Sequence, residues 1–332
     1  MLSSEIMTDL YPLKFKTIFK DKIWGGMKIK TLLAKDFSPL PNCGETWEIS
    51  GVEGNISEVA TGALAGMGLK DLINTYKGEL LGQRVYEAYG EEFPLLIKFI
   101  DANDDLSVQV HPDDILAGER HRSKGKTEMW YVLQADEGAS LVSGFNREVT
   151  QQEYMERLKN GSLMDILNKE EATEGDMYFI PAGRVHTIGK GLLIAEIQQT
   201  SDLTYRIYDF DRKDAEGKTR ELHIEEALEA IDYKAYPEYK TNYRKVKNEA
   251  VRAVSCAYFT TQYLEMDQCV VRDLRKNDSF VIYIGLEGRT QVKSAGKKEI
   301  INAGECLLVP ACLAEVELVP EKNSRLLETY IP

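Results

Sequence analysis

The chain contains four histidines, and two of them combine with nearby polar residues in a pattern that could bind a metal ion. Gln109 and His111 lie two residues apart in a strand-like stretch, so both side chains should point to one face of a strand. Glu128 begins a second strand-like stretch, and His186 follows a third. Two imidazoles, a carboxylate and an amide oxygen suit Zn²⁺, and Mn²⁺, Fe²⁺ or Co²⁺ could also occupy such a site.

The remaining histidines and the cysteines indicate no further site. His121 and His223 are interpreted as surface residues, because a lone histidine in a β protein is more often exposed or part of the core than a ligand. His121 stands in a basic cluster at 120–124 that we interpret as a solvated loop. The five cysteines are odd in number and form no CxxC pair, so we expect neither a disulfide framework nor a thiolate metal site.

An internal repeat indicates how the histidines are placed. Gly175–Ala182 and Gly304–Ala311 share a pattern in which an acidic residue follows the glycine and a proline stands six positions after it. This pattern resembles the second motif of cupins, in which a turn, a strand and a proline lead to a histidine. The first copy has His186 at that position, whereas the second has Glu315. We therefore expect two similar domains, only one of them equipped for a metal.

Short strand-like stretches bounded by turn residues dominate the chain and predict a mainly β protein with a few short helices. The expected strands are 13–19, 46–50, 55–60, 95–100, 107–110, 128–133, 177–180 and 192–198, and the expected helices are 69–89, 151–159, 161–168 and 224–231. With the repeat, these predict two cupin-type jelly-roll β-barrels. Residues 1–240 would form a metal-binding catalytic cupin domain, and residues 241–332 a smaller, structural C-terminal domain without a metal site.

Composition excludes several classes of partner. The formal net charge is −13 over 332 residues, which argues against binding to nucleic acid, since that requires a basic face. No stretch approaches 18 apolar residues, so we expect no membrane span. The first ten residues lack the layout of a signal peptide. We expect a cytoplasmic protein, as a monomer or a homodimer.

Seven segments in chain order resemble the signatures of type I phosphomannose isomerases, specifically the short bacterial form. They are Trp24–Gly26, Gly44–Ser50, Pro94–Lys98, Gln109–Pro112, Gly125–Tyr131, Pro181–His186 and Thr204–Phe210. The resemblance implies a zinc enzyme of the cupin superfamily, with one Zn²⁺ per chain, that interconverts the sugar phosphates mannose 6-phosphate and fructose 6-phosphate. It also implies that His111, Glu128 and His186 bind the metal with Gln109 as fourth ligand, and that Arg206 is the active-site arginine.

Such an isomerisation moves a proton between C2 and C1 through an enediol, so negative charge on two oxygens must be stabilised. We assign this task to the metal and Arg206. Glu196 or Lys98 could move the proton, and Lys98 would then need a pKa lowered by the metal and by burial. An ion pair that orients Arg206 is an equally good interpretation of Glu196. The candidates for binding the phosphate are Lys126, Lys98 and Arg184.

Two other functions fit part of the pattern. Two histidines and a carboxylate form the metal triad of non-haem iron oxygenases, which would show oxygen-dependent turnover. A non-catalytic cupin that binds sugar phosphates could also derive from an isomerase. Loss of catalysis should then be accompanied by replacement of Arg206 or of a metal ligand, and all of these residues are present.

Overall fold

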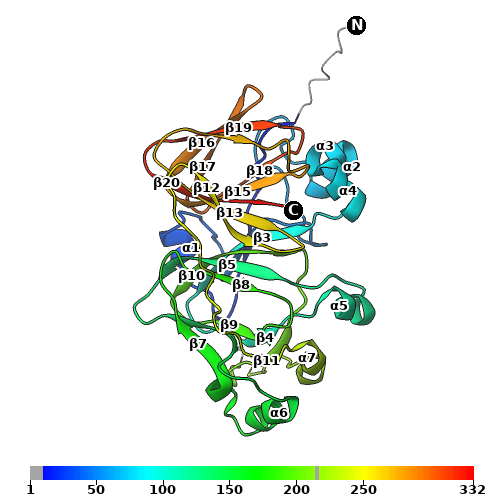
Figure 1. Cartoon of the computed structure of the whole chain (residues 1–332), viewed down its shortest axis with the longest axis vertical. Helices are drawn as coiled ribbons and strands as arrows, with labels where there is room; N and C mark the ends of the chain where they lie inside the picture. The colour runs from blue at the N-terminus through cyan, green and yellow to red at the C-terminus, as the bar shows by residue number, and fades with distance from the viewer. Residues whose placement is uncertain (1–9, 214–216) are drawn as a thin grey trace. The chain divides into compact units, whose positions relative to one another are not determined.

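Antiparallel strand pairs organise the chain into sheets that belong to two compact units (Figure 1). The computed structural model describes residues 10–213 and 217–332. We call the unit formed by Thr17–Val52 and Leu95–Asn242 the histidine unit. The C-terminal unit contains Tyr243–Pro332 together with Glu53–Pro94 and the N-terminal segment up to Lys16. The first nine residues, on which part of the cytoplasmic prediction depends, lie outside the described residues.

Two sheets build the histidine unit. The first has the order β1 (Ile18–Lys20), β2 (Glu45–Ile49), β3 (Leu95–Ala102), β10 (Leu192–Gln199), β5 (Glu128–Ala135) and β8 (Met177–Ile180). The second has the order β11 (Tyr205–Tyr208), β4 (Val108–Val110), β9 (His186–Ile188), β6 (Ser140–Phe145) and β7 (Leu167–Glu171). Its helices are α1 (Lys28–Thr31), α5 (Asp114–His121), α6 (Gln151–Lys159), the 3₁₀ turn η1 (Leu163–Ile166) and α7 (Ile224–Ala230).

The core of the histidine unit explains why β4 presents polar residues inward. Val108 and Val110 pack in a cluster with Tyr154 of α6 and Ala227 of α7. Because side chains alternate along a strand, Gln109 points to the opposite face. A second cluster contains residues of both sheets, among them Trp130, and fills the space between them. The alternation predicted for this stretch therefore places the candidate ligands at the inner face.

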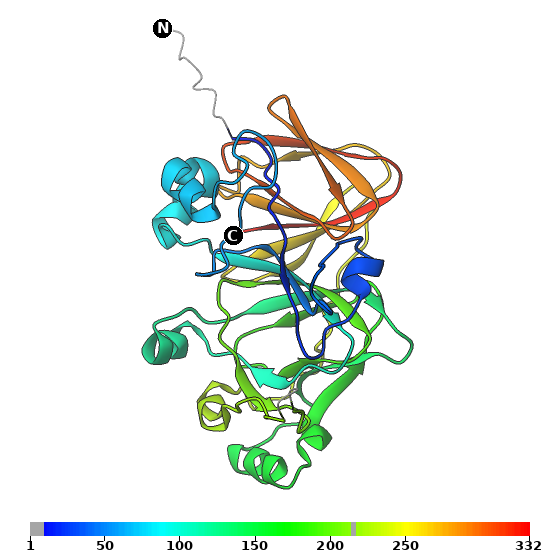
Figure 2. The ribbon, with the colours of Figure 1, turned by 180° about the vertical axis from the view of Figure 1, so that it is seen from behind.

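Two sheets also build the C-terminal unit. One has the order β12 (Ala250–Ser255), β13 (Thr260–Met266), β20 (Ser324–Tyr330), β15 (Val281–Glu287) and β18 (Cys306–Val309). The other has the order β14 (Val270–Asp273), β19 (Glu315–Pro320), β16 (Arg289–Ser294) and β17 (Lys297–Asn302). The helices α2 (Leu69–Tyr76), α3 (Gly78–Leu81) and α4 (Gln83–Tyr89) form one group in both views (Figures 1 and 2).

The mainly β fold class and the cupin fold are confirmed, with the refinement that the sheets are not closed into barrels. The chain passes from the histidine unit to the C-terminal unit between residues 242 and 243, close to the expected boundary. The earlier segment Glu53–Pro94 also belongs to the C-terminal unit. The division into a metal-binding catalytic domain at 1–240 and a smaller domain without a metal site at 241–332 stays a prediction. Among the described residues, no helix is long and apolar enough to cross a membrane.

The helices predicted from local sequence signals agree with the structure only in part. The helix at 151–159 is confirmed, and Thr150 caps it by accepting a hydrogen bond from the backbone N–H of Glu153 (3.1 Å). The single helix expected at 69–89 was wrong, because Lys77 and Gly82 have positive φ angles and divide it into α2, α3 and α4. The solvated loop expected at 120–124 was wrong in part, since its first two residues end α5, which Asp113 caps.

Candidate metal centre

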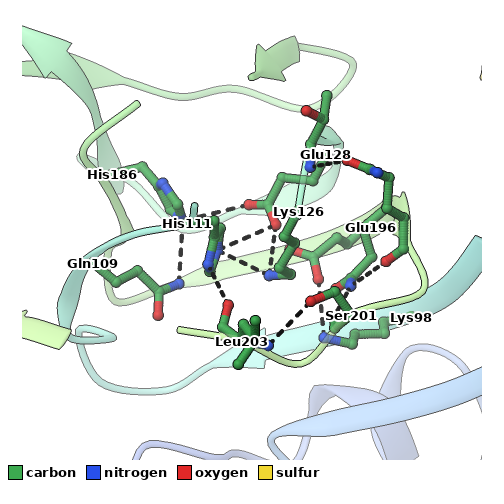
Figure 3. A network of polar contacts seen from close by, with 12 residues as sticks. Lys98, Gln109, His111, Lys126, Glu128, His186, Glu196, Ser201 and Leu203 are labelled. Carbon is green, nitrogen blue, oxygen red and sulfur yellow. Dashed lines mark hydrogen bonds and ion pairs between the residues drawn. The ribbon is translucent and has the colours of Figure 1, made fainter. Parts of the chain in front are cut away.

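Three strands and their ends bring the four expected metal ligands together (Figure 3). Gln109 lies directly opposite His186 in the pairing of β4 with β9, so both side chains point to the same face. Glu128 places one carboxylate oxygen 3.5 Å from His111 Nε2 and the other 3.5 Å from His186 Nε2. The two histidines and Glu128 are at most 1% exposed. Strands far apart in sequence therefore converge on one buried cluster.

Hydrogen bonds fix the protonation of both imidazoles. His111 Nδ1 lies 2.8 Å from the carbonyl oxygen of Leu203, and His186 Nδ1 lies 2.8 Å from that of Arg184. A carbonyl can only accept, so each Nδ1 donates and each Nε2 keeps its lone pair, which faces Lys126 Nζ in His111 and Gln109 Nε2 in His186. Burial lowers the pKa of His186 to about 3 and that of His111 well below its usual range. Both rings are therefore neutral at pH 7, as metal ligands must be.

The donor set fits a divalent cation. Among the described residues, His111, Glu128 and His186 form a group whose ligand atoms all lie within 4.8 Å of one another. Glu128 Oε1 is buried without a hydrogen-bond partner, and burial together with the charge of Glu196 raises the pKa of this carboxyl to about 7. A cation would relieve both conditions. Gln109 Nε2 lies 3.2 Å from His186 Nε2, and a flip of the amide would present its oxygen instead.

Lysines bind the carboxylates around this cluster. Lys126 Nζ lies 2.6 Å from Glu128 Oε2 and 3.0 Å from His111 Nε2. Lys98 Nζ lies 3.2 Å from Glu196 Oε1, and Trp130 Nε1 donates to the other oxygen of Glu196 at 2.9 Å. Figure 3 shows Lys98 and Glu196 beside Lys126 and Glu128. Positive charge therefore lies on the same side of the cluster as two buried carboxylates.

The pKa shifts in this network follow from burial and charge. Burial alone would raise the pKa of Glu196, but Lys126 and Lys98 lower it to about 2. Burial alone would lower the pKa of Lys98, but the carboxylates of Glu196 and Glu45 raise it. To act as a base, Lys98 would need a lowered pKa. The shift has the opposite direction, so Lys98 is held as an ammonium group.

Arg206 reaches the inner face from β11, where it lies opposite Gln109. Its Nη1 donates to the carbonyl oxygen of Glu221 (2.9 Å), and its Nε is buried without a hydrogen-bond partner. Burial, together with nearby Arg220, lowers the pKa of Arg206. A buried N–H without a partner is costly in isolation, so this group is available to an anionic ligand. No ion pair between Glu196 and Arg206 is found among the described residues.

The other expected residues have different surroundings. The guanidinium of Arg184, proposed to bind phosphate, packs against the rings of Tyr236 and Tyr239, which meet edge to face. His121 is exposed, as expected, and its Nε2 lies 2.8 Å from the hydroxyl of Tyr205. His223 was wrongly interpreted as a surface residue, because it is half-buried and its Nδ1 accepts a hydrogen bond from the backbone N–H of Arg206.

Sequence reasoning missed the residues that support the cluster from a distance. Asp209 lies within the signature segment Thr204–Phe210 but was given no role there; it accepts hydrogen bonds from both Arg212 and Arg220, beside Arg206. Tyr236 and Tyr239 carry no motif and follow α7 along the chain. Only the spatial pairing of segments brings them to the site, and no sequence signal could have selected them. The fold and the site together define a cupin protein whose histidine unit carries a candidate metal centre.

Comparison with known proteins narrows this class. Residues 12–138 match the family model described as phosphomannose isomerase type I, catalytic domain. Mannose-6-phosphate isomerase ManA of Bacillus subtilis is 36% identical over 92% of this chain and 95% of its own length. The mannose-6-phosphate isomerase of Streptococcus mutans is 34% identical over 90% of this chain and 92% of its own. The chain therefore belongs to the type I phosphomannose isomerase family, and the expectation of an enzyme of this family is confirmed.

A solved structure agrees with this assignment. The crystal structure of mannose 6-phosphate isomerase from Bacillus subtilis superposes with a TM-score of 0.86 at 29% identity. The superposition covers 96% of this chain and 99% of the Bacillus subtilis chain. The likeness therefore extends over both units and is not confined to the segment that the family model matches.

Proposed function

We propose that the chain is a zinc-dependent isomerase that interconverts mannose 6-phosphate and fructose 6-phosphate through an enediol intermediate. The observation that carries this proposal is the buried cluster of His111, His186 and Glu128, with two neutral Nε2 atoms and an unpartnered carboxylate oxygen, in a chain of this family. His111, Glu128, His186 and Gln109 would hold one Zn²⁺. The bound ion would supply Lewis-acid polarisation of the substrate oxygens.

The other residues of the site would manage charge and protons. Arg206, with a buried N–H that lacks a partner, would stabilise the negative charge that develops on the enediol oxygens. Glu196, held as a carboxylate, is the candidate proton acceptor. Lys98, held as an ammonium group, is the candidate proton donor. The two lie 3.2 Å apart, so a proton of the Lys98 ammonium group is within reach of the Glu196 carboxylate.

Substrate phosphate would be bound through positive charge at the edge of this cluster. Lys126 is 5% exposed and already contacts Glu128, so it can exchange one anionic partner for another. Binding energy from a phosphate remote from the reacting carbons would hold the opened sugar in a reactive geometry. A phosphate contact by Arg184 also stays a prediction, although its present contacts favour the different role argued below.

A coupled assay tests the proposal. Purified protein is assayed with mannose 6-phosphate before chelation, after chelation and after addition of Zn²⁺, Mn²⁺, Fe²⁺ or Co²⁺ in turn. We expect activity that is lost with the chelator and restored best by zinc, and that Glu128→Gln abolishes. A metal-loaded protein without isomerase activity would refute the proposal and favour the non-catalytic binder. Turnover that depends on oxygen would favour the oxygenase. Family membership supports the isomerase over both.

A further inference from the structure

We propose that Arg184 is a positioning residue, whose side chain packs against two tyrosine rings that meet edge to face, so that its backbone carbonyl orients the metal ligand His186. The inference rests on the proposed function, because it concerns a residue that holds one of the proposed ligands. It assigns to Arg184 a task different from the phosphate binding expected from the sequence.

The clamp consists of Arg184, Tyr236 and Tyr239. The guanidinium carbon lies 4.6 Å from the centre of the Tyr236 ring and 4.7 Å from that of the Tyr239 ring. These distances are typical of cation–π contacts. Arg184 as a whole is only 8% exposed, so the rings and their surroundings remove most of it from water. A buried guanidinium held in this way has little freedom to reach toward a ligand.

Each tyrosine ring is itself fixed by hydrogen bonds. The Tyr236 hydroxyl donates to Asp232 Oδ2 at 2.6 Å. The Tyr239 hydroxyl donates to the carbonyl oxygen of Phe145 at 2.7 Å and accepts from the backbone N–H of Tyr236 at 3.1 Å. Gly144 has a φ of +71°, and a Cβ added there would lie 2.4 Å from the Tyr239 ring. The ring therefore packs directly on the end of β6.

The loop that carries Arg184 touches both proposed histidine ligands. The Arg184 carbonyl accepts the hydrogen bond from His186 Nδ1 at 2.8 Å, and this bond sets which ring nitrogen faces Glu128. The neighbouring Gly183 donates its backbone N–H to the carbonyl oxygen of His111 at 2.9 Å. Movement of this loop would therefore displace both imidazoles. Outer partners of this kind set the orientation and basicity of metal-binding histidines.

The clamp joins this loop to a segment that follows it by about fifty residues in the sequence. The backbone N–H of Asp232 donates to the carbonyl oxygen of Gly183 at 2.8 Å, beside the contacts of Tyr236 and Tyr239 with Arg184. The segment therefore holds the loop both through its backbone and through the Arg184 side chain. Removal of the side chain would leave the backbone bond but release the clamp.

The experiment measures metal binding separately from catalysis. Apoprotein of the full chain is titrated with Zn²⁺ against a chromophoric chelator, and the absorption spectrum of the Co²⁺ form reports ligand geometry. We expect Arg184→Met to weaken Zn²⁺ binding by about 10- to 100-fold and to change the Co²⁺ spectrum. Arg184→Lys should restore part of the affinity, because it retains a cation against the two rings. In the zinc-saturated variant, a KM for mannose 6-phosphate within twofold of wild type separates this positioning role from a phosphate contact, which would raise the KM.

Controls separate the possible outcomes. Lys245→Met removes a cation 5.6 Å from the Tyr243 ring in the C-terminal unit and should leave Zn²⁺ affinity unchanged. Tyr239→Leu removes one face of the clamp without touching Arg184 and should weaken Zn²⁺ binding in the same direction. Unchanged Zn²⁺ affinity in Arg184→Met, with a lower unfolding midpoint alone or with a raised KM, would overturn the inference. Failure of the wild-type protein to bind Zn²⁺ would instead refute the proposed function.

Discussion

The buried pair of Lys98 and Glu196 provides a quantitative test of the charge network. Their charged atoms lie 3.2 Å apart, and the side chains are only 8% and 4% exposed. Glu196→Gln keeps the shape of the side chain and the acceptor for Trp130 but removes the negative charge. The ammonium group of Lys98 would then lose its nearest counter-charge inside the protein. We predict that this single change destabilises the fold far more than an average surface substitution.

The magnitude follows from the distance and the burial. At an effective dielectric constant near 20, unit charges at this separation attract by about 5 kcal/mol. Breaking a buried pair by removing one partner costs about 3–5 kcal/mol, because the other charge stays buried. Glu45 also acts on Lys98, so part of the charge remains balanced in the variant. We therefore expect a loss of about 3 kcal/mol in the free energy of unfolding.

A double-mutant cycle measured by denaturant unfolding checks this reasoning. Lys98→Met combined with Glu196→Gln should recover most of the loss, because replacing both charges leaves neither unpaired. Glu317→Gln, in an exposed pair with Lys293, serves as a control that should change stability little. A loss below about 1 kcal/mol for Glu196→Gln, or a double mutant whose loss equals the two single losses together, would refute the argument.

Three further predictions concern charge, pH and backbone geometry. Arg206→Gln should lower kcat by about 10²- to 10³-fold in the coupled assay, with Zn²⁺ affinity unchanged; a kcat near wild type would contradict the assigned role. Burial acts to raise the pKa of Glu305, but the contact with Lys14 holds that pKa below its usual 4.5. The Glu305 carboxylate therefore contributes fully to stability above pH 4.5. This contribution is lost as the pH falls through the pKa that Glu305 has in the folded protein. The stability deficit of Glu305→Gln at pH 7 should therefore shrink toward pH 3 in unfolding curves, and a constant deficit would argue against it. Gly82→Ala should destabilise the C-terminal unit by about 1–3 kcal/mol, since φ is +94° and the new Cβ would lie 2.1 Å from a carbonyl oxygen. Gly54→Ala, where no atom lies near the new Cβ, serves as the control and should lower the free energy of unfolding by less.

Several features of the protein could be predicted from the sequence because they depend on neighbours in the chain. Thr150 and Glu153 are three residues apart, and that spacing alone caps α6. The strand at Met177–Ile180 is bounded by local turn signals on both sides. Alternation along β4 placed Gln109 and His111 on one face without knowledge of the fold. Local spacing was sufficient in each case.

The motifs also placed the candidate ligands, although they lie far apart along the chain. His111, Glu128 and His186 were selected by residue type and resemblance, and the structure brings them together. Residue type and resemblance did not show that Glu196 and Lys98 form a pair or how their pKa values shift. Their proximity follows from the pairing of β10 with β3, and the direction of their pKa shifts depends on how completely both are buried.

Tertiary structure alone decided which distant segments support the site. Tyr236 and Tyr239 reach Arg184 only because the chain after α7 returns to the loop before β9. Glu53–Pro94 joins the C-terminal unit, although the histidine unit continues on both sides of it in the sequence. The sequence by itself determined residue types, the elements bounded by local caps and turns, and the candidate ligands of the centre. Packing determined their charge states and supports, because burial and long-range pairing depend on the whole fold.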